Sequence, residues 1–178
     1  NSVTDYAYDD KNRVIEVIYY SFAGDWTQEK CEYDEERSNL RLRSTTAYEY
    51  NTYGLLETET VTPVDELTNQ TPNITETLVT TREYDTSTMK IFGALVKETD
   101  ALGNSTKYFY NSKYGYLLAS IGPDGNGMTY TYDALGRMTL ALPAVTSGSS
   151  YTSAGPERVA YTYDDTDRLS TISRYGTS

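Results

Sequence analysis

The sequence lacks histidine altogether and contains one cysteine, Cys31, among its 178 residues. Without histidine, the chain cannot build a Ser-His-Asp or Cys-His catalytic group or a histidine-ligated metal site. Cys31 has no second cysteine with which to form an internal disulfide or to share a metal ion, so we expect it to be an ordinary strand residue. The sequence therefore predicts no metal and no cofactor.

Positive charge and long apolar runs are also scarce. The net charge is −11, and an acidic chain does not attract phosphate backbones, so we expect no nucleic-acid partner. No apolar run approaches the length of a membrane span, so we expect no membrane insertion. Apolar residues at helical spacing extend for no more than a turn or two, which leaves β structure as the predicted class.

Carboxylates are the only catalytic residue type that the chain holds in quantity. A glycosidase needs two of them facing one another at a fixed separation, but with 26 acidic residues almost any pair could be imagined. The prominent Asp9, Asp133 and Asp164 share one position in a repeated motif, and a turn role explains all three together. A turn role also explains Asp165 and Asp167 more simply than a calcium site does. We therefore predict that the chain is not an enzyme.

What the sequence has in abundance is tyrosine, with 19 residues, arranged in an internal repeat. The copies read Tyr-x-Tyr, then Asp or Asn, then Gly, Asn or Asp a few residues further on, and most then continue with Arg or Leu and an apolar residue. Such a repeat indicates a small unit stacked on copies of itself. A degenerate copy surrounds Tyr33, and Tyr84 with Asp85 begins another. The clear copies are Tyr6–Val14, Tyr130–Met138 and Tyr161–Leu169, and looser copies are Tyr48–Leu56 and Tyr108–Leu117.

Each copy predicts a strand, a tight turn and a returning strand. The Asp or Asn starts the turn by bonding its own backbone, and a residue that tolerates positive φ closes it, as in a type I turn with a glycine-type bulge. In the Tyr110 copy the loop is one residue longer and should differ. The positions expected to hold positive φ are Asn12, Gly54, Gly115, Gly136 and Asp167.

A second family of turns, Asp100–Asn104 and Gly122–Asn126, alternates with the first. Two turn types should therefore join the strands into a long antiparallel meander. The residues that define the repeats structurally are Tyr6, Tyr8, Asp9, Asn12, Arg13, Tyr48, Tyr50, Asn51, Gly54, Tyr108, Tyr110, Asn111, Gly115, Tyr130, Tyr132, Asp133, Gly136, Arg137, Tyr161, Tyr163, Asp164, Asp167 and Arg168.

The tyrosines have two competing interpretations. Both rings of a pair share one face of their strand, and cross-strand packing is the favoured role for any one ring. The second tyrosines, which we expect to be largely buried, are Tyr8, Tyr50, Tyr110, Tyr132 and Tyr163. Exposed rings could instead stack on sugars, and the densest cluster supplies the candidate sugar-stacking residues Tyr108, Tyr114 and Tyr116.

The motif Tyr-x-Tyr-Asp-x-x-Gly-Arg-Leu resembles the YD repeat of the rearrangement-hotspot (Rhs) family. Tyr130–Met138 departs from it only at its last residue, and Tyr161–Leu169 only at Asp167. The resemblance implies a single YD-repeat region over residues 1–178, with residues 1–43 more divergent and residues 44–178 clearer. Loop insertions are expected near residues 62–75 and 143–158, and Leu55–Thr60 is expected to pair with Glu76–Tyr84.

The resemblance also implies an architecture and a function. Repeated antiparallel β-hairpins should form an open, strongly twisted spiral sheet, a segment of a larger β-shell. In bacterial Rhs proteins and in the B and C subunits of insecticidal toxin complexes such a shell encloses a C-terminal toxin, and in teneurins a similar shell belongs to an adhesion receptor. The implied partners are the rest of the parent shell, its cargo and a cell-surface glycan, and the implied location is secreted or at the cell surface.

Two functions stay open. The chain is either a non-catalytic wall segment of such a shell or an extracellular carbohydrate-binding and adhesion module that uses exposed tyrosine rows. We expect it to be a piece of a longer protein, without the self-cleaving core segment or a toxin domain. An excerpt of a spiral should be an open sheet with unpaired edges, through which isolated copies can self-associate.

Overall fold

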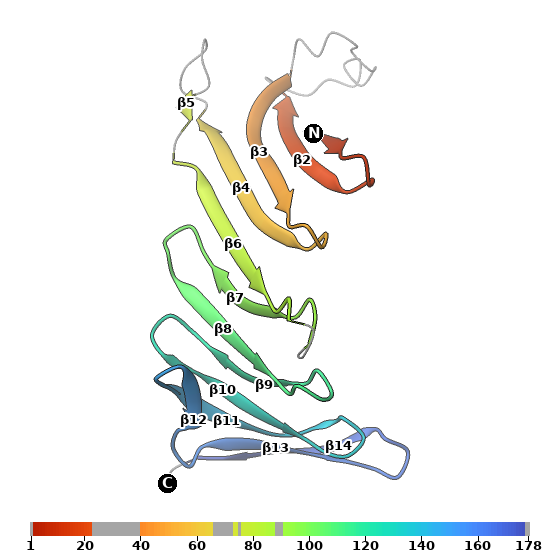
Figure 1. The fold of residues 1–178 in the computed structure, drawn as a ribbon, viewed down its shortest axis with the longest axis vertical. Helices are drawn as coiled ribbons and strands as arrows, with labels where there is room; N and C mark the ends of the chain where they lie inside the picture. Colours follow the sequence, from red (N-terminus) through yellow and green to blue (C-terminus); the bar gives the residue numbers. More distant parts are fainter. Residues whose placement is uncertain (1, 23–39, 66–72, 75, 88–90, 177–178) are drawn as a thin grey trace. The chain divides into compact units, whose positions relative to one another are not determined.

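The computed structural model describes residues 2–22, 40–65, 73–74, 76–87 and 91–176. Over these ranges the regular structure is entirely β, which confirms the all-β prediction (Figure 1). Thr, Val, Ile and Tyr fill the strands, because branched and aromatic side chains suit a pleated surface. The strands are β1 (Ser2–Tyr8), β2 (Val14–Phe22), β3 (Leu40–Tyr50), β4 (Leu56–Asp65), β5 (Asn73–Ile74), β6 (Leu78–Tyr84), β7 (Leu95–Thr99), β8 (Ser105–Tyr110), β9 (Leu117–Ile121), β10 (Asn126–Tyr132), β11 (Met138–Ser147), β12 (Ser150–Ser153), β13 (Arg158–Tyr163) and β14 (Leu169–Tyr175).

The chain divides into two compact units, Asn1–Thr81 and Arg82–Ser178. In the first unit the strand order is β1-β2-β3-β4-β6, with β5 paired to β4. In the second it is β7-β8-β9-β10-β11-β13-β14, with β12 paired to β11, and β6 continues into this unit as the neighbour of β7. In this order β1 and β14 each have a single neighbour, so the sheet is open, as predicted.

Six of the connections form hairpins that match the repeats. Each hairpin has a first strand that ends on a tyrosine, followed by a turn and a return strand. We call the final tyrosine of the first strand the anchor tyrosine. The hairpins are β1–β2, β3–β4, β6–β7, β8–β9, β10–β11 and β13–β14, and their anchor tyrosines are Tyr8, Tyr50, Tyr84, Tyr110, Tyr132 and Tyr163.

All five junctions between successive hairpins share one register. At each junction, the third residue of a return strand lies opposite the residue three places before the next anchor tyrosine. The paired residues are Glu16 and Ala47, Thr58 and Thr81, Lys97 and Lys107, Ala119 and Thr129, and Leu140 and Ala160. A one-residue slip would turn every side chain of a strand to the other face, so this constancy indicates a strongly specified pairing.

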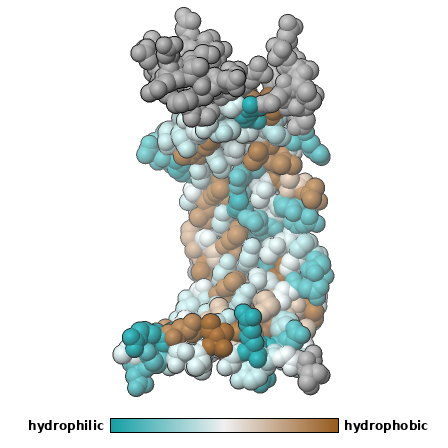
Figure 2. Space-filling model, turned by 180° about the vertical axis from the view of Figure 1, so that it is seen from behind, coloured by the Kyte–Doolittle hydropathy of each residue, from teal (hydrophilic) through white to brown (hydrophobic). Residues whose placement is uncertain are grey.

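The core is thin and built from small side chains. Among the described residues, the buried apolar ones are Ala119, Ile121, Ala141 and Ala144, on β9 and β11. Thr129 is also buried, and it lies on β10, the strand between β9 and β11. Apolar and polar side chains alternate across the face in Figure 2. Much of the stability must therefore come from half-buried rings and from hydrogen bonds rather than from a deep apolar centre.

Both stretches expected to be loops contain strand. β4 continues to Asp65, where it pairs with β5, and β11 continues to Ser147, where it pairs with β12. Proline, serine and glycine suggested loops there, but Val64 and Val145 lie on these strands and favour extended backbone. The expected pairing of the strands around the first stretch is confirmed by β4 and β6. The Tyr33 copy lies outside the described residues.

Candidate functional site

The first residue of each repeat turn organises the turn with its side chain. Asp9 Oδ1 accepts hydrogen bonds from the backbone N–H groups of Lys11 and Arg13, both at 2.9 Å. A β-bulge separates Ala7 and Tyr8, as the turn type predicts. The same pair of bonds organises the turns that begin at Asn51, Asp133 and Asp164.

The predicted backbone angles are confirmed at all five positions. The φ values are 61° at Asn12, 82° at Gly54, 78° at Gly115, 82° at Gly136 and 63° at Asp167. The longer loop differs as expected, because Asn111 accepts from the N–H groups two and three residues further on instead of two and four.

The second turn family has the same geometry as the first. Asp100 N–H donates to the Asn104 carbonyl at 2.9 Å, and Gly103 N–H donates to the Asp100 carbonyl at 3.0 Å. The turn from Asp133 repeats both bonds at 3.0 and 3.1 Å. The turn from Gly122 makes the same two bonds, from Gly122 N–H to the Asn126 carbonyl at 2.8 Å and from Gly125 N–H to the Gly122 carbonyl at 3.1 Å. The expectation of two turn types is therefore wrong, because a fourth residue with positive φ gives one backbone path in both families. The two families differ in the arginine that follows three of the first turns, at Arg13, Arg137 and Arg168, and neither of the second.

That arginine is fixed by the aspartate of its own turn. Arg13 Nε donates to Asp9 Oδ2 at 2.7 Å, and Arg137 Nε donates to Asp133 Oδ2 at 2.7 Å. The backbone N–H of each arginine, together with its guanidinium, lowers the pKa of the aspartate below its usual value. Asp164 holds Arg168 in the same way at 2.9 Å. Each arginine is therefore pre-positioned before it meets a neighbouring repeat.

In the first unit Arg13 contacts the next hairpin. Its guanidinium lies 4.3 Å from the centre of the Tyr50 ring, and the Tyr50 hydroxyl donates to the carbonyl of Val14, the residue after Arg13, at 2.8 Å. We call this combination the inter-repeat lock. It consists of a backbone carbonyl that accepts a hydrogen bond from the anchor tyrosine of the next hairpin, and of a planar side-chain group that covers the ring of that tyrosine. It joins a cation–π contact to a hydrogen bond.

The second unit repeats the lock between the last two hairpins. Arg137 lies 4.5 Å from the centre of the Tyr163 ring, and Tyr163 donates to the Met138 carbonyl at 2.7 Å. Arg137 Nη1 also reaches Asp167 Oδ1 at 2.6 Å, so one arginine joins its own turn to the next one. The arginine side chains in the two locks are about a quarter exposed, 26% for Arg13 and 27% for Arg137.

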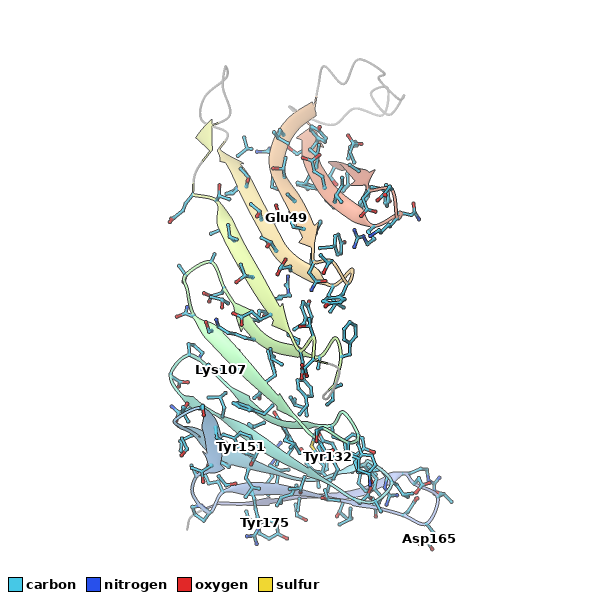
Figure 3. The ribbon with its side chains drawn as sticks, in the orientation of Figure 1. Glu49, Lys107, Tyr132, Tyr151, Asp165 and Tyr175 are labelled. Atoms are coloured by element: carbon cyan, nitrogen blue, oxygen red, sulfur yellow. The ribbon has the colours of Figure 1, made fainter. Side chains whose placement is uncertain are left out.

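A third lock uses tyrosine where arginine is missing. Tyr132, labelled in Figure 3, donates to the Leu117 carbonyl at 2.8 Å. The Tyr116 ring lies 4.9 Å from the Tyr132 ring. Tyr114 stacks in turn on Tyr116 at 5.5 Å. Burial raises the pKa of Tyr132. It also raises the pKa of Tyr110, the anchor tyrosine of the preceding hairpin.

The expectation of burial is wrong for Tyr8. Its relative exposure is 52%, whereas Tyr50, Tyr110, Tyr132 and Tyr163 are half-buried. An anchor tyrosine is covered by the return strand of the preceding hairpin, and β1 has no strand on that side. At the opposite end, Arg168 is 78% exposed although its own turn holds it like the other two arginines.

The first tyrosines of the pairs differ in exposure. Tyr130 Oη lies 3.3 Å from Ser120 Oγ on the neighbouring strand, while Tyr48 and Tyr161 are half-buried and Tyr6 is exposed. Sequence reasoning identified these positions but missed the lock. The arginine recurs at the same distance from its aspartate, but no sequence signal identifies the ring that it contacts.

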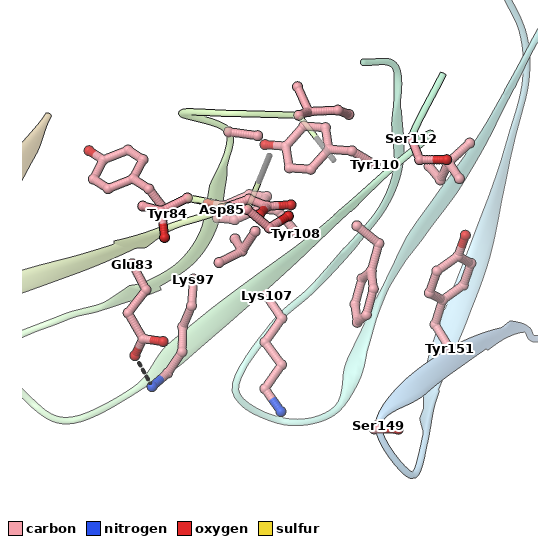
Figure 4. A pocket seen from close by; sticks show the side chains of 17 residues that line it. Glu83, Tyr84, Asp85, Lys97, Lys107, Tyr108, Tyr110, Ser112, Ser149 and Tyr151 are labelled. Carbon is pink, nitrogen blue, oxygen red and sulfur yellow. Dashed lines mark hydrogen bonds and ion pairs between the residues drawn. The ribbon is translucent and has the colours of Figure 1, made fainter. Parts of the chain in front are cut away.

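The second unit also has an aromatic groove of about 730 Å³ between β6, β8 and β12 (Figure 4). Tyr108 and Tyr110 line it with Tyr151, whose ring lies 4.9 Å from that of Phe109. The candidate sugar-stacking residues are therefore divided: Tyr108 faces the groove, whereas Tyr114 and Tyr116 belong to the stack beside the third lock. Lys107 also lines the groove, and Lys97 there pairs with Glu83 at 2.7 Å.

Neither a family model nor a curated protein matches the sequence. Among solved structures, the chain is similar to a TcdB2-TccC3 complex at 14% identity and a TM-score of 0.35, over 98% of this chain and 11% of that one. It is similar to the Tc holotoxin pore of Photorhabdus luminescens at 13% identity and a TM-score of 0.35, over 98% and 10%. A protein of unknown function from Bacteroides fragilis matches at 10% identity and a TM-score of 0.31, over 98% and 92%.

The chain thus spans about a tenth of the length of the toxin chains that it matches. In the described part of the chain, no helix has the length and apolar character needed to cross a membrane.

Proposed function

We propose that the chain is a non-catalytic structural segment of a large secreted or cell-surface YD-repeat protein. In this proposal its two units belong to one repeat region, which contributes wall to a shell around a toxin or another C-terminal cargo. The partners are the rest of the parent shell and that cargo. The resemblance of the repeats to the YD motif is the starting point.

The inter-repeat lock is the observation that carries the proposal. In the locks that contain arginine, the aspartate and the arginine of one turn bind each other, and the arginine covers the anchor tyrosine of the next hairpin. Asp133 holds Arg137, and Arg137 holds Tyr163, so the chemistry of the motif is structural. A repeat whose recurrent groups bind the following repeat is suited to building a continuous wall.

Protease protection in the full-length protein that contains this sequence tests the proposal. A C-terminal cargo inside a shell should resist trypsin under native conditions and become cleavable once mild urea opens the wall. The matched measurement is the cleavage of an exposed terminal tag, which should be fast in both conditions. Equal cleavage rates of the cargo with and without urea would contradict an enclosing wall.

A second candidate function is carbohydrate binding, and the aromatic groove favours it. The Tyr151 ring packs on Phe109, on the same side of β8 as Lys107, and an aromatic ring beside an ammonium group suits a sugar that carries a carboxylate (Figure 4). A glycan array would measure this with Tyr151→Ala, because Tyr151 lies on β12, off the main strand order. Tyr114→Ala is the control, since its exposed ring lies outside the groove. Binding that only the second variant loses would move the site to the stack at Tyr116.

We also propose that the isolated chain self-associates through its open edges. Unpaired strand edges are templates for pairing with another chain. The net charge of −11 per copy opposes association, so it should strengthen as salt screens the repulsion.

A further inference from the structure

The two edge strands of the sheet carry complementary halves of one inter-repeat lock. In β13–β14, Arg168 is held by Asp164 as Arg137 is held by Asp133, yet its side chain is 78% exposed against 27% for Arg137. In β1, Tyr8 ends the strand as an anchor tyrosine and is 52% exposed. The first hairpin thus has an anchor tyrosine, Tyr8, with an exposed ring, and the last hairpin has an arginine, Arg168, that is positioned to cover such a ring.

The acceptor carbonyl of the lock is also in place on β14. The Arg168 carbonyl accepts from Asp164 N–H within its own hairpin, as the Arg13 carbonyl accepts from Asp9 N–H. Successive carbonyls of a strand point to opposite sides, so the next carbonyl, that of Leu169, points to the outer edge. This is the position from which Val14 and Met138 accept from their anchor tyrosines.

The surfaces of the two strands match in chemistry. Leu169 and Ile172 of β14 are 50% and 54% exposed, and Tyr6 of β1 is 56% exposed, so apolar surface is available on both strands. The only charged side chain within β14 is Arg174, and the only one within β1 is Asp5. The local charges are therefore opposite, although the whole chain is acidic.

We propose that β1 of one copy docks on β14 of a second copy and completes the lock between them. The Tyr8 hydroxyl of one copy donates to the Leu169 carbonyl of the other, and Arg168 covers the Tyr8 ring. This inference rests on the proposed self-association and specifies its contacts. Because each copy presents both halves, the contact is head-to-tail, and association builds chains or rings of copies rather than a two-fold dimer.

The constant junction register fixes how the two strands align. Thr171 is the third residue of β14, and Asp5 lies three residues before the anchor tyrosine Tyr8. By the rule that all five junctions obey, Thr171 of one copy lies opposite Asp5 of the next. The contact between copies is thereby defined to the residue.

Sedimentation velocity over a concentration series of the 178-residue chain tests the contact. We expect species larger than the monomer to form, and Tyr8→Ala and Arg168→Ala each to raise the dissociation constant by about tenfold, since each removes the lock through an exposed side chain. Tyr114→Ala, which changes a comparably exposed ring away from both edges, should leave it unchanged. A wild-type chain that stays monomeric, or association indifferent to both edge variants, would overturn the proposal.

Disulfide trapping tests the register. Copies with Thr171→Cys are mixed with copies with Asp5→Cys, both in a Cys31→Ser background, and should cross-link into a dimer. Copies with Thr4→Cys should not cross-link with Thr171→Cys, because a shift of one residue turns the thiol to the opposite face. Preferential cross-linking through Thr4→Cys would overturn the register. A monomeric chain would leave the wall function standing, since protease protection tests that function separately.

Discussion

At the residue scale, the fourth residue of a repeat turn determines whether the arginine of the preceding hairpin has a carboxylate partner there. In the last hairpin this position is Asp167, which bonds Arg137 Nη1 at 2.6 Å. In the second hairpin it is Gly54, whose added Cβ would lie 3.4 Å from Arg13 Nη1. That nitrogen is buried and has no hydrogen-bond partner among the described residues. A missing carboxylate thus leaves a donor of Arg13 unsatisfied.

Gly54→Asp should supply this partner. Both Gly54 and Asp167 have positive φ, so aspartate fits this backbone conformation. We expect the free energy of unfolding of Gly54→Asp, measured by urea denaturation, to exceed that of Gly54→Ala by about 1 kcal/mol. The same comparison in an Arg13→Ala background is the control, because the carboxylate then has no guanidinium to bind. An equal advantage in both backgrounds would show that the gain has another source.

Gly136 is constrained twice, by its backbone and by a neighbouring ring. Its φ is 82°, and a Cβ there would collide with the hydroxyl and ring of Tyr116. Gly103 has the same φ but nothing within 4 Å of the added atom. Gly103→Ala should therefore cost about 1–2 kcal/mol for the backbone alone, and Gly136→Ala at least about 1 kcal/mol more. Urea unfolding of the two variants measures the difference, and equal losses would mean that the Tyr116 ring moves aside freely.

At the scale of the elements, the hairpins could be predicted from sequence and their junctions could not. Turn chemistry is local: Asp133 and Gly136 lie three residues apart and fix the turn wherever they occur. The lock joins Arg13 to Tyr50 and Arg137 to Tyr163 across different lengths of chain, so no fixed spacing signals it. The strand ends at residues 62–65 and 143–147 were missed for a related reason, because pairing with β5 and β12 overrides a loop-like composition.

A double-mutant cycle measures the coupling between adjacent hairpins. Arg137→Ala and Tyr163→Ala should together cost about 1 kcal/mol less than the sum of the two single losses, since each alone already abolishes the cation–π contact. The control cycle pairs Arg137→Ala with Tyr161→Ala, whose ring does not lie under the guanidinium. Additive losses in the first cycle would contradict the lock as an energetic unit.

At the scale of the whole molecule, stability should have a limit at both ends of the pH range. The turn aspartates have lowered pKa values, and hydrogen bonds from the Thr166 side chain and the Arg168 backbone lower that of Asp164 to about 2. An aspartate whose pKa is lowered by folding stabilises the folded state at pH values above its pKa in the unfolded chain, which is about 4. This stabilisation is lost as the pH falls through the pKa of the folded state. Burial raises the pKa of Tyr132 and Tyr110, so their contribution is present below about pH 10 and is lost as the pH rises beyond it.

The urea midpoint as a function of pH checks both limits. It should stay level at neutral pH, fall between about pH 4 and 2, and fall again above about pH 10. Asp164→Asn should flatten the acid limb, because an amide still accepts the turn hydrogen bonds, as Asn51 does, but does not titrate. An acid limb that this variant leaves as steep would assign the loss to other carboxylates.

The constant junction register has a consequence for how the chain can change over generations. Its five instances include junctions whose strands are joined by connectors as different as residues 100–104 and residues 148–157, which contain β12, so the alignment of a hairpin does not depend on the linker before it. A gene of this kind can gain or lose a whole hairpin by unequal recombination, and the flanking hairpins can meet in the same alignment as before. Linkers can likewise accept insertions without shifting the strands downstream, so both the number of repeats and the lengths of the connectors are free to vary.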